Sequence, residues 1–386
     1  MNKKNFKIIS LFMAVILIAV SFSTRVEAKT LKATVSGETL EAGKQFTLTN
    51  MPYNGKYSPI KEYAGSPLNF SSVQNFAYTP DGKYIFTTSE CRTSGTKHTL
   101  LCRCTVPGTK SADATAECVD TLVLGRYGHG EAIDITQDDP NSEVYNLWVA
   151  TTPNSGTIFG TEIARITYKV TNGKGSIVKT VKITNFRKAN VVKGKAKYFK
   201  GKPKPRRLNV SIDKANNQIM FRVQFPTGKG VNYVAYDYDK LNTALNKVGN
   251  NGKYSITKAA KWQKANLRTS LVPYMTFQSF AISDNKLYVC GGHMNKGAQI
   301  YVIKYKTCKN VKKIKMQEKM KNSQIYKIYD ITPQITVADK TLGIADLEIE
   351  GMKLEKDASG KLYAHVNFFM NKTPIRESIG IYKFGL

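Results

Sequence analysis

The stretch QSFAISDNKLYV, residues 278–289, carries the pattern that decides the fold. It opens on a polar residue, Gln278, and then alternates apolar and polar positions up to an Asp-Asn pair, after which a second apolar run follows. Asn and Asp tolerate the positive backbone φ that a tight hairpin turn requires. The stretch is therefore predicted to form an antiparallel β-hairpin.

The same pattern recurs along the chain, at intervals of roughly 55–80 residues. The other copies begin at Gln74, Glu131, Leu208 and Glu350, and Leu208 is preceded by two basic residues, Arg206 and Arg207. Further strand-like runs follow most copies. Four short strands per unit at this spacing are typical of β-propeller blades that carry loop insertions.

These five copies predict an all-β fold, a single five-bladed β-propeller over residues 29–386 with short helical insertions at 239–248 and 258–267. Strand-like runs within residues 29–60 are expected to complete a blade with the C-terminal strand, which would remove an exposed sheet edge. A large β-sandwich or two separate β-domains are the alternatives.

The N-terminal residues have the pattern of a signal peptide. Lys3, Lys4 and Lys7 precede an apolar run at 8–20, and small residues surround the expected cleavage point after Ala28. The apolar run is shorter than the roughly 20 residues of a spanning helix, which argues against an uncleaved anchor. Residues 1–28 are thus predicted to be removed, and the mature chain, with no later membrane-spanning segment, to be secreted.

The composition excludes intrinsic disorder, because 41% of the 386 residues are hydrophobic and 10% are aromatic. Six cysteines are too few for a disulfide-stabilised miniprotein. Secretion permits disulfides, and Cys290 with Cys308 is the pair we expect, since the two follow neighbouring strand-like runs. The remaining cysteines leave three pairings open and show no zinc-ligand spacing: Cys91, Cys102, Cys104 and Cys118.

At the hairpins the sequence resembles the helveticin J family, large heat-labile bacteriocins of Gram-positive bacteria. The resemblance lies in GHGEAI (128–133), QSFAI (278–282), DLEIE (346–350) and IYKF (381–384). Asp346 stands where that family tends to have His. The resemblance implies a secreted antibacterial protein or a cell-surface binding relative, and it supplies no established set of catalytic residues.

Polar residues at the start of each hairpin are the first candidate site. In a propeller the innermost strand opens each blade, so Gln74, Glu131, Gln278 and Glu350 would surround a central channel. Together with His129 and Glu348 they could bind a ligand, or Ca²⁺ through carboxylates at the channel mouth. They could equally satisfy backbone groups and channel water. Glu131 and Glu350 could act as a glycosidase pair only at a separation of about 5–10 Å.

A dense basic run is the second candidate site, with Tyr198 and Phe199 inside it. It contains no acidic residue and consists of Arg187, Lys188, Lys193, Lys195, Lys197, Lys200, Lys202, Lys204, Arg206 and Arg207. A second cluster comprises Lys309, Lys312, Lys313, Lys315, Lys319 and Lys321. Clustered lysine attracts phosphate groups, although a merely solvated loop would have the same composition.

The chain has a net charge of +30, or about +27 after removal of residues 1–28, which hold four basic and one acidic residue. The expected partners are envelope polyanions, teichoic acid or anionic lipid head groups. Nucleic acid is disfavoured, since no stacking motif appears. The sequence therefore predicts a secreted, bacteriocin-like antibacterial protein that binds anionic envelope components without a cofactor. The alternatives are a glycan hydrolase or lyase that uses the channel carboxylates, or a non-toxic adhesin.

Overall fold

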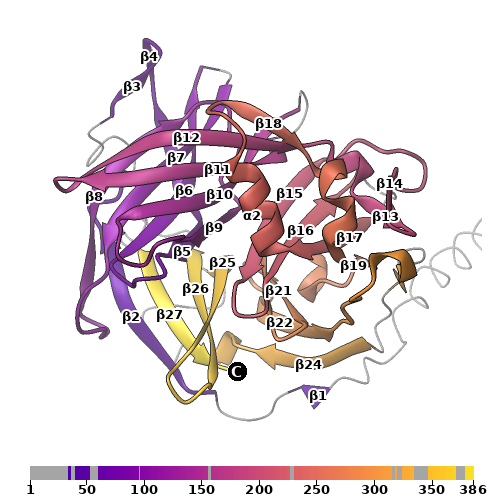
Figure 1. Cartoon of the computed structure of the whole chain (residues 1–386). Helices are drawn as coiled ribbons and strands as arrows, with labels where there is room; N and C mark the ends of the chain where they lie inside the picture. The colour runs from indigo at the N-terminus through magenta and orange to yellow at the C-terminus, as the bar shows by residue number, and fades with distance from the viewer. Residues whose placement is uncertain are drawn as a thin grey trace, which may run out of the picture.

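All five predicted hairpins form in the computed structural model of the chain, which confirms the all-β prediction (Figure 1). The structure describes residues 34–35, 40–52, 60–94, 96–154, 158–226, 230–314, 318–319, 324–333, 347–370 and 379–386. The predicted signal peptide, 1–28, lies outside these ranges, as do Lys315, Lys321 and Asp346.

Each hairpin continues into a four-stranded antiparallel unit. Unit 1 contains β5 (Asn69–Tyr78), β6 (Tyr84–Thr93), β7 (Thr96–Thr105) and β8 (Thr115–Leu124). Unit 2 contains β9 (Ile133–Thr136), β10 (Val144–Pro153), β11 (Gly160–Thr171) and β12 (Lys174–Thr184). Unit 3 contains β15 (Arg207–Asp213), β16 (Gln218–Gln224), β17 (Val231–Asp237) and β19 (Gln263–Arg268). Unit 4 contains β20 (Ser279–Ser283), β21 (Lys286–His293), β22 (Gly297–Lys304) and β24 (Ile325–Asp330).

Unit 5 combines the two ends of the described chain. It contains β25 (Leu347–Lys356), β26 (Leu362–Met370), β27 (Ile379–Gly385) and β2 (Ala42–Thr49), and β2 runs antiparallel to β27 (Figure 1). β2 also pairs in parallel with β8 of unit 1. This second pairing joins units 5 and 1 into one eight-stranded sheet.

Short strands and helices are inserted between or added to the four-stranded units. Three short strands pair in parallel with the outermost strands of units 4, 2 and 3. They are β1 (Thr34–Val35), which pairs with β24, β18 (Gly252–Ser255), which pairs with β12, and β23 (Glu318–Lys319), which pairs with β19. Two small hairpins are β3 (Glu62–Tyr63) with β4 (Ser66–Pro67), and β13 (Asn190–Val192) with β14 (Lys195–Lys197). The helices described within these bounds include α2 (Tyr238–Asn246), η1 (Phe186–Lys188), η2 (Ile256–Trp262), η3 (Pro273–Met275) and η4 (Val311–Lys313).

The helix predicted at 239–248 forms as α2, one residue earlier, and the side chain of Asp237 caps it by accepting from the amide of Lys240. The segment 258–267 is only partly helical, because η2 ends at Trp262 and the chain then pairs with β17 as β19. Strand pairing in unit 3 outweighs the local preference there. Within the described ranges no helix is both long and apolar enough to cross a membrane.

The innermost strands of the units contact each other in cyclic order. β5 contacts β9, β9 contacts β15, β15 contacts β20, β20 contacts β25, and β25 contacts β5. Five apolar clusters fill the spaces between consecutive units, and the last of them lies between units 5 and 1. The hydrophobic core is therefore divided into five wedges between sheets.

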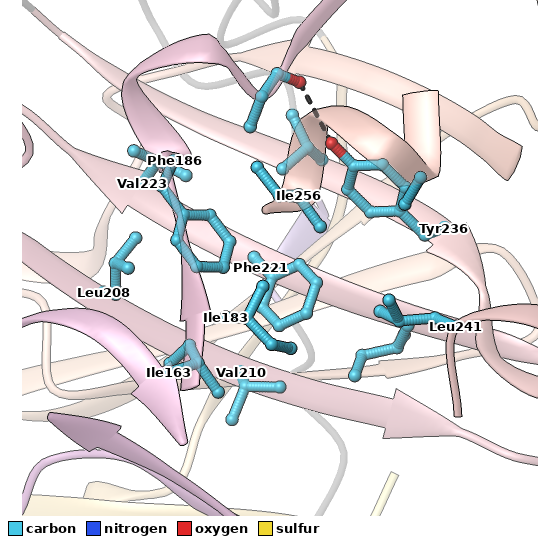
Figure 2. Close-up of a cluster of buried hydrophobic side chains, with 14 of the residues drawn as sticks. Ile163, Ile183, Phe186, Leu208, Val210, Phe221, Val223, Tyr236, Leu241 and Ile256 are labelled. Atoms are coloured by element: carbon cyan, nitrogen blue, oxygen red, sulfur yellow. Dashed lines mark hydrogen bonds between the residues drawn. The ribbon is translucent and has the colours of Figure 1, made fainter. Parts of the chain in front are cut away.

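Figure 2 shows the wedge between units 2 and 3. Ile163 and Ile183 of unit 2 face Phe221 and Val223 of unit 3, and Phe186 of η1 closes the cluster. Full burial of each such side chain contributes roughly 1.5–3 kcal/mol, so this contact holds the two units together. The hydroxyl of Tyr236, a polar atom within this wedge, donates to the carbonyl of Ala189 at 3.2 Å.

The predicted disulfide between Cys290 and Cys308 is absent, and both residues are free thiols. Cys290 is fully buried on β21, in the wedge between units 4 and 5. Cys308 lies beyond the end of β22, where its amide donates to the carbonyl of Lys264 in unit 3. The two apolar runs do pair as β21 and β22, but register places Ile300, not Cys308, opposite Cys290.

Candidate functional site

A pocket of about 290 Å³, which we call the inner-strand pocket, lies where several inner strands begin. Five of the six predicted channel residues line it: Gln74, His129, Gln278, Glu348 and Glu350. Glu131, the sixth, is buried beside it, with its carboxylate 4.0 Å from the Nε of Arg207, which also lines the pocket. The cyclic contact of the inner strands thus brings together residues from distant parts of the sequence.

Two glycines and a β-bulge orient the side chains of His129, Glu348 and Glu350 toward the pocket. Gly128 and Gly130 both have positive φ, +96° and +88°, and a side chain on either would press against backbone atoms of a neighbouring segment. These two glycines hold His129 at the pocket. On β25 a bulge between Ile349 and Gly351 interrupts the ladder directly after Glu348 and around Glu350.

The backbone of Glu131 is held by two neighbouring units. Asn75 of unit 1 and Asn209 of unit 3 both donate their side-chain amides to its carbonyl, at 3.0 and 3.1 Å. Its carboxylate makes no hydrogen bond of normal geometry. Burial raises the pKa of Glu131 to about 7, although the nearby guanidinium of Arg207 acts in the opposite direction.

The two carboxyls on β25 are also difficult to ionise. Burial raises the pKa of Glu350 well above its usual value, and the proximity of Glu348 adds to the effect. Gln74 donates to Glu350 at 3.4 Å, and Gln278 donates to Glu348 at 2.6 Å. Burial likewise raises the pKa of Glu348. Glutamines of units 1 and 4 therefore bind the carboxyls of unit 5.

A further carboxylate in the pocket has the opposite behaviour. Glu90 of β6 is buried, and burial by itself would raise its pKa. Hydrogen bonds from Lys97 and Arg92, with the charge of Lys97, outweigh that effect and lower the pKa of Glu90. The repeat pattern did not reveal Glu90 because it lies on the second strand of its unit. The one sequence feature that could have pointed to Glu90 is the presence of a carboxylate within a strand-like run of apolar and hydroxyl-bearing residues.

His129 is neutral at neutral pH, because burial lowers its pKa to about 4. Its ring stacks on Phe159 at 5.4 Å between centroids, and its Nε2 lies 3.8 Å from a carboxylate oxygen of Glu90. Phe159 belongs to the loop before β11 and was not predicted from sequence. The pocket thus combines carboxyls, amides and one aromatic surface.

Arg207, predicted as part of the basic surface, instead lies inside the pocket with a side chain only 12% exposed. Its guanidinium packs against the rings of Phe159 and Phe277, at 4.5 and 5.0 Å. It begins β15, so in the third repeat it is Arg207 that takes the polar first position. Leu208, which the repeat alignment placed there, packs in the apolar wedge between units 2 and 3.

The other nine residues of the basic run lie in η1, in the β13–β14 hairpin and in the segment that leads from β14 to β15. Arg187, Lys188 and Lys202 surround the ring of Tyr198, at 4.8, 4.7 and 5.8 Å from its centroid. The amide of Lys193 donates to the carbonyl of Ile314 at 2.9 Å. This bond brings the run against η4, whose neighbourhood exposes Lys309, Lys312 and Lys313.

We call this joined region the basic surface. Its exposed or half-exposed lysines in the described ranges are Lys188, Lys193, Lys195, Lys197, Lys200, Lys202, Lys204, Lys309, Lys312 and Lys313. No described carboxylate lies within salt-bridge distance of any of them. Their charges are therefore available to an external anion.

The expectation of a calcium site finds no support in the described part of the chain. There, no group of three or more His, Cys, Asp or Glu side chains is arranged to hold a metal ion. In the pocket, Glu348 and Glu350 are occupied by glutamine amides and Glu90 by basic groups.

Comparison with known proteins gives one family match. The family model described as "Bacteriocin helveticin-J" matches residues 77–385. No curated protein matches the chain.

Solved structures with a similar overall form are only distantly related. A GH43 endo-arabinanase from Bacillus licheniformis has a TM-score of 0.38 and 10% identity, covering 82% of this chain and 94% of its own. The catalytic domain of a Coprinopsis cinerea GH62 alpha-L-arabinofuranosidase has a TM-score of 0.37 and 6% identity, covering 89% and 97%. Likenesses this weak carry no conclusion about activity.

The raised pKa of Glu131 predicts a pH-dependent stability. Its carboxyl is protonated in the folded state up to about pH 7 but ionises near 4.5 when unfolded. Stability supplied by this shift is present below pH 4.5 and is lost as pH rises through 7, a change of about 3 kcal/mol. We expect Glu131→Gln, which cannot ionise, to gain stability over the wild type by about that amount at pH 8 relative to pH 4.5.

Urea unfolding of both proteins across this pH range measures the difference. Glu62→Gln, at an exposed position, serves as the control and should shift stability equally at both ends. A pH-independent effect of Glu131→Gln would contradict the assignment.

Proposed function

The chain belongs to the helveticin J family of bacteriocins, and we propose that it is a secreted antibacterial protein that attaches to anionic components of a competing cell's envelope. The family match spans residues 77–385, which is most of the chain. Secretion is supported by the signal-peptide pattern of residues 1–28. The net charge of +30 suits an anionic target.

We infer that the scaffold is a five-bladed β-propeller. Five four-stranded units, cyclic contacts between their inner strands and an apolar wedge between each pair of neighbours support this architecture. The pairing of β2 with β27 would make unit 5 the blade that joins the two ends of the chain.

The contact between Lys193 and Ile314 is the observation that carries the attachment proposal. It unites two lysine clusters that lie more than one hundred residues apart in sequence. Each basic residue near an anionic surface contributes about 1 kcal/mol, so a joined cluster binds far better than two separate ones. Teichoic acid and anionic lipid head groups are the envelope polyanions that such a surface fits.

We expect neutralisation of this surface to weaken attachment by at least about tenfold, given about 1 kcal/mol per residue. The variant combines Lys193→Gln, Lys195→Gln, Lys312→Gln and Lys313→Gln. Its control removes the same charge from exposed positions elsewhere, through Lys61→Gln, Lys174→Gln, Lys253→Gln and Lys296→Gln. Sedimentation with intact Gram-positive cells over a salt series measures binding, and colony counts from the same tubes measure killing.

Wild-type binding should weaken as salt rises. Equal losses in the two variants would mean that only total charge matters and would contradict a dedicated surface. Binding by the wild type without any loss of viability would favour the adhesin.

A second candidate function, glycan cleavage, is favoured by one observation in the inner-strand pocket. The environments of Glu90 and Glu350 push their pKa values in opposite directions, which is how an enzyme obtains an ionised base and a protonated acid at one pH.

This candidate predicts that the wild type releases reducing ends from purified cell walls and that Glu350→Gln lowers the rate by at least about 10²-fold, the usual contribution of a general acid. Reducing-end assays on the same wall preparation check it. The candidate is excluded if the wild type releases none above a heat-inactivated sample.

A further inference from the structure

A second pocket, of about 450 Å³, lies beside the basic surface. Its walls come from the end of η2, the end of β17 and the loop that follows β22. We call it the indole pocket, because Trp262 lines it. Four lysines line it as well: Lys240, Lys261, Lys264 and Lys309. It shares Lys309 with the basic surface but has no residue in common with the inner-strand pocket.

The indole pocket has an excess of positive charge. Asp237 is its one acidic lining residue, and it pairs with Lys240 and Lys264 at 3.7 Å each. Lys261 and Lys309 have no salt-bridge partner within the described ranges. Two lysine charges are therefore uncompensated in a concave site, where an anion would neutralise them.

Trp262 supplies an apolar surface next to those charges. Its side chain is half-buried against the wedge between units 2 and 3, and the ammonium of Lys261 lies 5.5 Å from the ring centroid. Asn216, Gln218 and Asn285 also line the pocket. Gln218 is buried and bonded to Asn285 and Tyr305, whereas the Oδ1 of Asn216 and the Nδ2 of Asn285 can still exchange hydrogen bonds with hydroxyl groups. An aromatic ring beside amides suits a carbon skeleton that carries hydroxyls.

The pocket is continuous with the basic surface. Val311, the first residue of η4, lines the pocket, and its side chain also lies against Gly194 at the tip of the β13–β14 hairpin. An anionic polymer bound along the exposed lysines of η4 and β13–β14 would therefore remain in a region of positive potential all the way to the pocket.

We propose that the indole pocket binds one repeating unit of a phosphodiester-linked polyol chain. Lys261 and Lys309 hold the phosphate, and the polyol lies on Trp262 among the amides. This inference rests on the proposed function, since it names the part of an envelope polyanion that is recognised individually. The basic surface supplies attraction, and the pocket supplies chemical selectivity.

Tryptophan fluorescence offers a direct test, because the chain has only two tryptophans and Trp148 is fully buried in the core. We expect soluble poly(glycerol phosphate) to change the emission of the wild type saturably, whereas neutral dextran should not. The double variant Lys261→Gln, Lys309→Gln should weaken this titration by about tenfold or more. Lys253→Gln with Lys258→Gln removes the same charge from exposed positions near the same helix and should leave it almost unchanged.

Two further measurements distinguish a soluble polymer from a lipid head group as the ligand, and failure of the pocket proposal from failure of the proposed function. Vesicles of phosphatidylglycerol present the same glycerol phosphodiester in a lipid head group, and a response to vesicles alone would assign the site to membranes rather than to a soluble polymer. If the wild type binds cells in a salt-dependent way but shows no emission change with either probe, the pocket proposal fails and the proposed function stands. If it binds neither cells nor polymer, the proposed function fails as well.

A separate observation concerns the four cysteines of unit 1. Cys104 of β7 and Cys118 of β8 are register partners, and the thiol of Cys118 interacts with those of Cys102 and Cys104. Cys91 of β6 is too far from the other three to pair with them. The register partner of Cys102 on β6 is Thr87, and Cys91 lies four residues, or about 13 Å, further along that strand. A disulfide requires Cα atoms within about 7 Å.

The geometry points to a disulfide between Cys104 and Cys118 in the oxidised protein. Cys102 is only diagonal to Cys118, at a typical Cα separation of about 7–8 Å, whereas directly paired residues lie about 4.5–5.5 Å apart. Each thiol loses a proton as the sulfur–sulfur bond forms, and the two electrons reduce a small-molecule disulfide to two thiols. Cys118 is partly exposed and can be reached by such an oxidant.

Peptide mapping without reduction tests this pairing after incubation of the folded chain with oxidised glutathione. We expect one linked peptide pair, containing Cys104 and Cys118, and four cysteines that alkylate after unfolding. Cys118→Ser should leave five alkylatable thiols and no link, while the matched variant Cys91→Ser should retain the link. Six alkylated thiols in the wild type, or a link through Cys102, would overturn the assignment.

Discussion

Every sheet of this protein must bury both of its faces, and the remainder of the architecture follows from that constraint. Along β10, Leu147 and Val149 pack against unit 1, whereas Trp148 and Ala150 pack against unit 3. A strand with apolar residues on both faces needs a neighbouring layer on each side. A ring of sheets gives every unit two neighbours, while a stack would leave two outer faces exposed.

Convergence of the inner strands also explains the chemistry of the inner-strand pocket. Each unit contributes residues on or next to its innermost strand to a narrow region, and there the side chains compete for the same donors. Glu131 is the extreme case, since its carbonyl is held from two sides while its carboxylate makes no hydrogen bond of normal geometry and lies 4.0 Å from Arg207. A buried carboxyl of this kind does not stabilise a fold.

The sequence predicts the repeated elements well and their junctions poorly. Local turn chemistry and alternation determine the hairpins, so all five could be located from residues within each copy. Arg207 was assigned to the basic surface because a one-residue offset in the weakest copy places it inside rather than outside. Glu90 and Phe159 reach the pocket from outside the repeat pattern, and Cys308 leaves its expected partner because the chain crosses to unit 3 after β22. The contact between Lys193 and Ile314 is equally invisible in sequence, since it depends on how two loops of different units pack.

The pairing of β2 with β27 has a consequence for how the chain reaches its final state. Ala42 and Phe384 are partners although 342 residues separate them, so the first long strand remains incomplete until the last one has been made. Contacts of such high sequence separation slow folding, because a very long loop must close before they form. During synthesis, units 1 to 4 can assemble while the fifth waits for the C-terminus. Unit 5 is therefore the last to be completed, because β2 and β26 both wait for β27, the strand that lies between them.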